Sequence, residues 1–142
     1  MKSGFSLIEL LVVIGILLIL GSGGFVVSSM FLNRRGGNQA VTTLKEAIRE
    51  AGLNSMSGKN GDRWGVKTES NKITVFAGDS FAARDSDLDE VWNLSRGVSL
   101  NDKEVVFSRW SGYPLGGEVE FQVNWSGGSK VIRVNLVGGI EE

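Results

Sequence analysis

The apolar and polar positions divide the chain into two parts with different patterns. From Phe5 to Leu32 the residues are almost all apolar or small, and Glu9 is the one charged residue among them. A helix of this length measures about 42 Å, which exceeds the roughly 30 Å hydrocarbon core of a bilayer. A secretory signal would have an apolar core of only about 7–15 residues and a small-x-small cleavage site after it. The pattern therefore predicts a membrane-spanning helix over residues 5–33.

A second helical pattern covers residues 38–56. Apolar residues recur at helical spacing on one face, while charged residues fill the other, and the apolar positions are Val41, Leu44, Ile48 and Ala51. We expect this face to pack against a sheet. The run Arg34–Gly37 predicts a break or an interfacial collar between the two helical segments, and the run from Gly58 to Asp62 ends the second one.

The remainder of the chain has the short alternating runs that are typical of β-strands. Residues 64–68 and 72–77 predict a hairpin, and residues 118–125 and 130–137 predict a second, antiparallel one around 126–129. Shorter strands are expected at 90–94, 98–100 and 104–110. A long helix followed by short strands predicts the α+β class, with the helix packed on an antiparallel sheet.

Composition removes several kinds of chemistry. The chain has no Cys and no His, which excludes disulfides, thiolate zinc sites and His-based catalytic dyads. The acids in Asp85–Glu90 begin like a calcium loop, but Glu90 and Arg96 occupy the positions where an EF-hand needs Gly and Glu. We expect a solvated loop there. No base–nucleophile spacing stands out, so we expect no catalytic residues, no metal ion, no cofactor and no enzymatic activity.

Two surface sets are candidates for ligand binding, and each has a simpler explanation. The aromatic set could stack on nucleobases or sugars, but most of its residues fall in predicted strands, so core or sheet-face packing is expected for the set: Trp64, Trp92, Trp110, Tyr113 and Trp125. The densest cationic set is explained by a solvated hairpin face, and it contains Lys59, Arg63, Lys67 and Lys72. The formal net charge of −1 gives no overall basic field.

Glu9 is the anomaly of the apolar segment. A carboxylate inside a bilayer costs a few kcal/mol, so it usually has a partner. One explanation is a helix that sits high in the bilayer, with Glu9 reaching the interface. The other is a positive charge from a second chain, because the segment itself holds no Lys or Arg between Phe5 and Leu32.

The start of the chain resembles the processing site of type IV prepilins and type II secretion pseudopilins. The matching residues, after a short basic leader, are Gly4-Phe5-Ser6-Leu7-Ile8-Glu9-Leu10-Leu11-Val12-Val13-Ile14. The resemblance implies that a prepilin peptidase cuts between Gly4 and Phe5 and methylates the new amine of Phe5. It also implies that Glu9 pairs with the free amine of a neighbouring subunit.

The same resemblance implies an organisation and a location. Residues 1–4 would be a leader, residues 5–33 a transmembrane and assembly helix, and residues 38–142 a globular pilin-like head. The precursor would cross the cytoplasmic (inner) membrane once, with the N-terminus on the inner side and the head outside, and would enter an extracytoplasmic filament after assembly. The expected partners are membrane lipid before assembly and other pilin or pseudopilin subunits afterwards.

Small residues interrupt the apolar segment at Gly21, Gly23 and Gly24. Each glycine lowers helix stability by roughly 0.5–1 kcal/mol relative to alanine. Two explanations stay open. The glycines could allow close helix packing in the membrane, or, as the resemblance to assembled pili implies, they could mark a segment that unwinds during assembly.

The order of the later elements resembles the GspH/FimT group of minor pseudopilins. The supporting runs are Ala47–Ala51, Trp64–Val66, Val106–Ser108 and the terminal hairpin. DNA-binding members of that group carry an arginine-rich end, whereas this chain ends in Glu141-Glu142, which argues against a nucleic-acid partner. We therefore expect a minor structural subunit at the tip or in the initiation complex of a type IV pilus or type II secretion pseudopilus. The alternative is a DNA- or ligand-binding receptor displayed by such a filament.

Overall fold

The computed structural model describes the backbone of residues 6–142 and the side chains of residues 6–21 and 34–142. The chain forms two compact units, Met1–Leu32 and Asn33–Glu142, and we call the second the head unit. Helix α1 (Leu7–Ser57) contributes residues to both. The break that the sequence predicted at Arg34–Gly37 is wrong, because these residues are helical and belong to α1.

The strands of the head unit form two antiparallel sheets. The first sheet has the order β3-β2-β1-β5-β6 and the second the order β4-β7-β8-β9. The first contains β1 (Trp64–Glu69), β2 (Lys72–Ala77), β3 (Asp85–Asn93), β5 (Lys103–Phe107) and β6 (Pro114–Leu115). The second contains β4 (Val98–Leu100), β7 (Val119–Trp125), β8 (Gly128–Val134) and β9 (Ile140–Glu141). Two 3-10 turns, η1 (Lys59–Gly61) and η2 (Phe81–Ala83), lie in the connections.

The structure confirms the α+β class and both predicted hairpins. Strand β1 pairs with β2, and β7 pairs with β8 from Val119–Val134 to Trp125–Gly128. The prediction of a solvated loop at Asp85–Glu90 is wrong, because these residues form most of β3. The expectation of a single sheet is also wrong, since β4 and β5 are neighbours in sequence but belong to different sheets.

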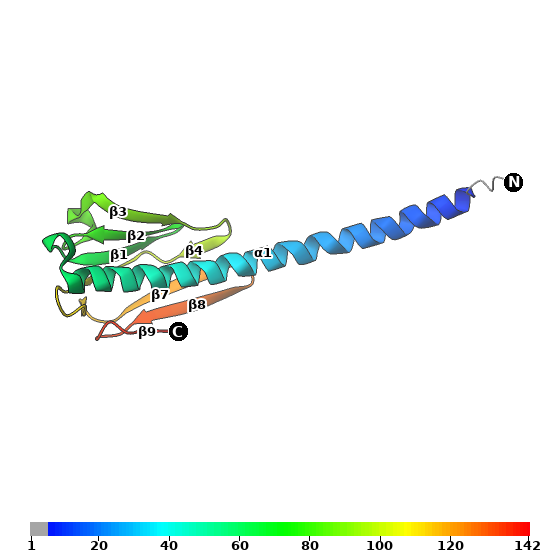
Figure 1. Ribbon diagram of the computed structural model, residues 1–142. Helices are drawn as coiled ribbons and strands as arrows, with labels where there is room; N and C mark the ends of the chain where they lie inside the picture. The colour runs from blue at the N-terminus through cyan, green and yellow to red at the C-terminus, as the bar shows by residue number, and fades with distance from the viewer. Residues whose placement is uncertain (1–5) are drawn as a thin grey trace. The chain divides into compact units, whose positions relative to one another are not determined.

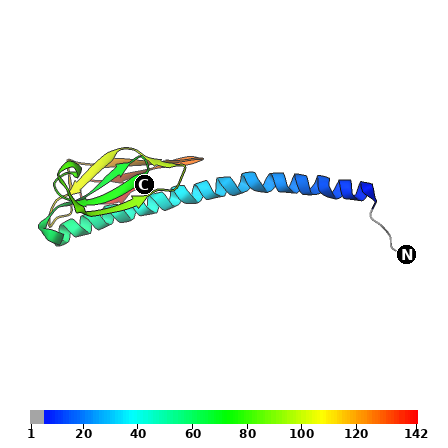
Figure 2. The ribbon, with the colours of Figure 1, turned by 90° about the horizontal axis from the view of Figure 1, so that it is seen from above.

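One hydrophobic core joins α1 to both sheets. In Figure 1 the C-terminal half of α1 runs along the strands of both sheets, and Figure 2 shows the strands gathered on one side of it. The predicted apolar face of the helix is buried, with exposed fractions of 4% for Val41, 0% for Leu44 and 1% for Ile48. This face belongs to the same cluster as Trp64 and Phe107 of the first sheet and as residues of the second sheet, including Phe121, Val123, Ile132 and Val134.

The glycines at Gly36–Gly37 explain how the helix approaches the second sheet. A Cβ atom built on Gly37 would lie 2.2 Å from Cδ2 of Trp125, at the end of β7. A Cβ on Gly36 would lie 3.4 Å from Cβ of Ser95. The indole of Trp125 therefore occupies the space that a side chain at Gly37 would need. These glycines form a packing notch within the helix, and this role accounts for the pattern that suggested a break.

Ser55 fixes the other end of the buried helix to the first sheet. Its hydroxyl is completely buried, accepts a hydrogen bond from the backbone N–H of Trp64 at 2.7 Å, and lies 3.2 Å from the carbonyl oxygen of Phe107. Its carbonyl oxygen accepts a hydrogen bond from the backbone N–H of Trp110 at 3.2 Å. One residue thus joins α1 to the start of β1, the end of β5 and the loop that follows β5.

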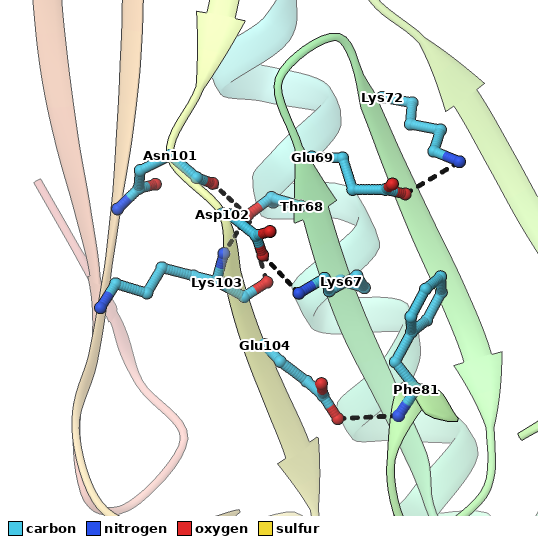
Figure 3. Close-up of polar contacts among 9 residues, drawn as sticks. All are labelled: Lys67, Thr68, Glu69, Lys72, Phe81, Asn101, Asp102, Lys103 and Glu104. Atoms are coloured by element: carbon cyan, nitrogen blue, oxygen red, sulfur yellow. Dashed lines mark hydrogen bonds and ion pairs between the residues drawn. The ribbon is translucent and has the colours of Figure 1, made fainter. Parts of the chain in front are cut away.

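A second buried hydroxyl holds the connection between the two sheets (Figure 3). Thr68 of β1 donates to the carbonyl oxygen of Asn101 at 2.7 Å and accepts from the backbone N–H of Lys103 at 3.2 Å. The side chain of Asn101 in turn accepts from the backbone N–H of Gln122 in β7 at 2.8 Å. These bonds fix the crossover from β4 to β5 between both sheets.

Replacing Gly37 with alanine should destabilise the head unit. The new methyl group would overlap the indole of Trp125, and overpacking of this kind costs about 1–3 kcal/mol. Gly52→Ala is the matched control, because Gly52 also lies inside α1 but has nothing within 4 Å of its Cβ position. That change should stabilise the helix by about 0.5–1 kcal/mol. Thermal unfolding of the full chain in detergent, followed by circular dichroism, measures both effects. Equal shifts for the two variants would contradict the packing notch.

Ser55→Ala should lower the free energy of unfolding by about 1–3 kcal/mol, because the buried N–H of Trp64 loses its acceptor. The control is Ser57→Ala, two residues further along α1, where the exposed hydroxyl bonds only to the carbonyl oxygen of Asn54. We expect that change to stay within about 0.5 kcal/mol of the wild type. If both variants unfolded at the wild-type temperature, Ser55 would not join the helix to the sheet.

Candidate functional site

The residues that suggest a function in the sequence lie at the start of α1 and just before it. Ser6 precedes the helix, Leu7 begins it, and Glu9 lies in its first turn. Gly4 and Phe5, the predicted cleavage and methylation positions, lie outside the described residues. The geometry of the site is therefore that of Ser6 and the helix that follows.

Ser6 and Glu9 form one half of a capping box. The backbone N–H of Ser6 donates to Oε2 of Glu9 at 3.0 Å, and the carbonyl oxygen of Ser6 accepts from the N–H of Leu10 at 3.3 Å. A glutamate three residues after a serine N-cap is a known signal for a helix start, and its negative charge is favourable at this end of the helix dipole. The Ser6-x-x-Glu9 spacing is the signal in the sequence for this role.

Glu9 also keeps the capacity to bind a second group. A carboxylate has two oxygens with about four acceptor positions. Within residues 6–21 and 34–142, the hydrogen bond from Ser6 is the one polar contact of Glu9. Its side chain lies in a shallow cleft beside Ile8, Val12 and Val13. A cationic partner would thus meet a carboxylate flanked by apolar side chains, where charges interact more strongly than in bulk water.

The large apolar side chains of this helix segment are exposed among the described residues. The large apolar residues from Leu7 to Leu20 are between 49% and 85% exposed. So large a continuous apolar surface is unusual on a soluble monomer and marks a site of contact with protein or membrane. In the part of the chain whose side chains are described, no helix is both long enough and apolar enough to cross a membrane.

The predicted glycine segment is only partly described. α1 is helical through residues 21–24, and Gly21 has nothing within 4 Å of its Cβ position. The surroundings of Gly23 and Gly24 lie outside the described residues. The two explanations for these glycines, helix packing and unwinding, therefore both stay predictions.

The acidic run Asp85–Glu90 is held in an extended strand with local partners. Asp89 binds Nε of Arg84 at 2.7 Å, and Oδ1 of Asp85 accepts from the N–H of Asp87 at 3.1 Å. Among the described residues, no group of three or more potential metal ligands comes together.

The cationic set is paired with acids across the surface of the head unit. Arg63 binds Asp79 at 2.7 Å, Lys72 binds Glu69 at 2.9 Å, Lys59 lies 4.0 Å from Glu90, and Lys67 binds Asp102 (Figure 3). The acidic end is paired as well, since Glu142 accepts from Lys45 and from Lys130. These bonds lower the pKa of Glu142 to about 2. Such pairing weakens the field that a polyanion would need.

The aromatic set divides into buried and exposed members. Trp64 is 1% exposed, and Trp92 and Trp125 pack against the core. The expectation of core or sheet-face packing is wrong for Trp110 and Tyr113, which are 73% and 51% exposed. Both lie in the segment after β5 and not in strands, since β5 ends at Phe107.

Two carboxylates meet where α1 faces β3. Burial and the neighbouring Glu90 raise the pKa of Glu50, while the nearby Lys59 opposes the rise. A neighbouring negative charge disfavours the ionised form of a carboxyl, so Glu50 is easier to protonate than an isolated glutamate. The pair is an electrostatic feature of the head unit and lies apart from the N-terminal residues in sequence.

Comparison with known proteins points to the N-terminal segment. Residues 1–25 match the family model of the prokaryotic N-terminal methylation motif. Neither the curated proteins nor the solved structures contain a significant match to the chain. The motif covers Gly4, Phe5 and Glu9, and it supports the resemblance to prepilin precursors that are processed by a peptidase.

Proposed function

We propose that this protein is a prepilin-type precursor that becomes a structural subunit of an extracytoplasmic filament. A prepilin peptidase cuts between Gly4 and Phe5 and methylates the amine of Phe5. The mature chain then enters a filament with other pilin or pseudopilin subunits. The observation that carries this proposal is the methylation motif over residues 1–25, within which the large apolar side chains from Leu7 to Leu20 are exposed.

The membrane and the filament provide cover for the same helix at different times. Before assembly, lipid of the cytoplasmic membrane surrounds residues 5–33, with the N-terminus inside and the head outside. After assembly, the apolar helices of other subunits replace the lipid. Exposure of side chains such as Leu7, Leu17 and Leu18 to water is unfavourable, and both lipid and neighbouring subunits would cover them.

Glu9 makes assembly specific. One oxygen caps the helix through the N–H of Ser6, and the second binds the methylated amine of Phe5 from a neighbouring subunit. Because both charges leave water together in a filament, loss of one partner is strongly unfavourable. The two roles use different acceptor positions of one carboxylate, so the helix cap does not have to open when subunits join.

Within the wider class, we propose a minor subunit similar to the GspH/FimT group. Support comes from the terminal β7–β8 hairpin and from the run Trp64–Val66 in the strand that follows the helix. The paired cations of the head unit favour a structural role over the alternative of a DNA receptor.

Glu9→Gln should separate assembly from processing. Glutamine keeps a carbonyl oxygen that can accept from Ser6, so the helix start is preserved, but it removes the charge that holds the amine. We expect normal cleavage and a loss of about 3–5 kcal/mol in subunit contact, as for other buried pairs. Crosslinking of the subunit to other pilins in intact membranes measures this loss.

The control for this experiment is Glu46→Gln, which removes an exposed acid from the head-unit part of the same helix. It should crosslink as the wild type does. Equal crosslinking of Glu9→Gln and wild type would show that Glu9 has no role in assembly, whatever the state of processing.

A further inference from the structure

Several exposed apolar side chains of the head unit line one groove. This distal groove lies between the last turns of α1 and the loops that follow β5 and β8. Its lining includes Arg49, Leu53, Met56, Tyr113 and Val137. The groove belongs entirely to the head unit and uses no residue of the methylation motif.

The apolar lining of the groove is open to solvent. Leu53 is 65% exposed, Val137 64%, Tyr113 51% and Met56 48%. Scattered apolar residues are ordinary on a surface, but a cluster around a hollow with a polar rim is typical of a protein–protein contact. Tyrosine and methionine are also among the residues enriched in such contacts.

The groove is built on a fixed loop. The backbone N–H of Trp110 donates to Ser55 at 3.2 Å, and that of Gly112 donates to the carbonyl oxygen of Ser108 at 3.1 Å. Gly112 has a φ of 66°, and a Cβ atom there would lie 2.7 Å from Cγ of Met56. Trp110 itself has a φ of 68°, an uncommon conformation for a bulky residue. A preformed surface loses less entropy on binding.

The charge in the groove indicates what kind of partner fits. Arg49 lines the groove and is exposed, and it makes no hydrogen bond or ion pair with any residue whose side chain is described. Among the described residues, most other cations of the head unit form ion pairs with acids. A twofold contact between the grooves of two copies would bring two Arg49 side chains together. Charge therefore disfavours a second copy and favours a partner that carries a carboxylate.

We propose that the distal groove binds an apolar segment of another protein that carries a carboxylate. The apolar side chains of the segment cover Leu53, Met56 and Val137, and its carboxylate pairs with Arg49 at the rim. The partner's polar remainder stays in solvent. This contact adds a binding surface on the head to the assembly contacts proposed for the N-terminal helix.

The test uses the full chain in lipid nanodiscs, labelled with ¹³C at the methionine methyl groups. Met56 lies in the groove, so its signal reports binding there even if a probe also enters lipid. The probes are the peptide Gly-Ser-Leu-Glu-Phe-Ser-Gly and its variants with Gln or Lys in place of Glu. We expect a saturable shift of the Met56 signal, with the Glu peptide binding about fivefold more tightly than the Gln peptide.

Variants of Arg49 make the result specific. Arg49→Gln should remove the preference for the Glu peptide, and Arg49→Glu should reverse it in favour of the Lys peptide. Arg96→Gln, at another exposed arginine of the head unit, should leave the preference unchanged. Three results would overturn the proposal: no saturable shift at millimolar peptide, equal affinity for all three peptides, or a Met56 shift that depends on protein concentration alone, which would identify a second copy as the occupant. Failure here would leave processing at Gly4 intact, so it is distinguishable from failure of the proposed function.

Discussion

The head unit depends on one buried face of α1, because that face packs into a core shared by two separate sheets. Val41, Leu44 and Ile48 fill the middle of the contact. At one end the notch at Gly37 admits the indole of Trp125 from the second sheet. At the other end Ser55 binds the first sheet through Trp64. This contact between α1 and the two sheets fixes the position of the helix, the packing of the sheets and the shape of the distal groove.

The same helix begins with apolar side chains that are exposed in the described part of the chain. Buried apolar residues stabilise the head unit, whereas the exposed ones from Leu7 onward must find lipid or protein. Glu9 adds a polar group to this apolar surface. It caps its own helix and still has acceptor positions for a second partner. The chain thus combines a head unit that has its own hydrophobic core with an N-terminal segment whose described apolar side chains are exposed. This division of roles is what a filament subunit needs.

The spacing of apolar residues along the chain was sufficient to predict much of the fold. The buried face of α1 and both hairpins could be predicted because apolar spacing reports burial directly. The Arg34–Gly37 run was misread because a glycine pair can signal either a break or a close contact, and only Trp125 decides which. The second sheet was missed because long-range pairing of β4 leaves no local signal. At the candidate site, Glu9 stood out by its charge. In the head unit, Trp110 was placed in a strand because alternation alone does not show that β5 ends at Phe107. The exposure of Tyr113, in the segment that follows β5, could not be predicted from the pattern either.

The central claim is that the chain is processed at the junction of leader and helix. Its most direct test is intact-mass and N-terminal peptide analysis of the wild-type chain, purified from membranes of cells that contain or lack a prepilin peptidase. The account predicts a chain that begins at Phe5 and carries one added methyl group when the peptidase is present, and a chain that keeps residues 1–4 when it is absent. A chain that keeps residues 1–4, or begins elsewhere, in the presence of an active peptidase would contradict it.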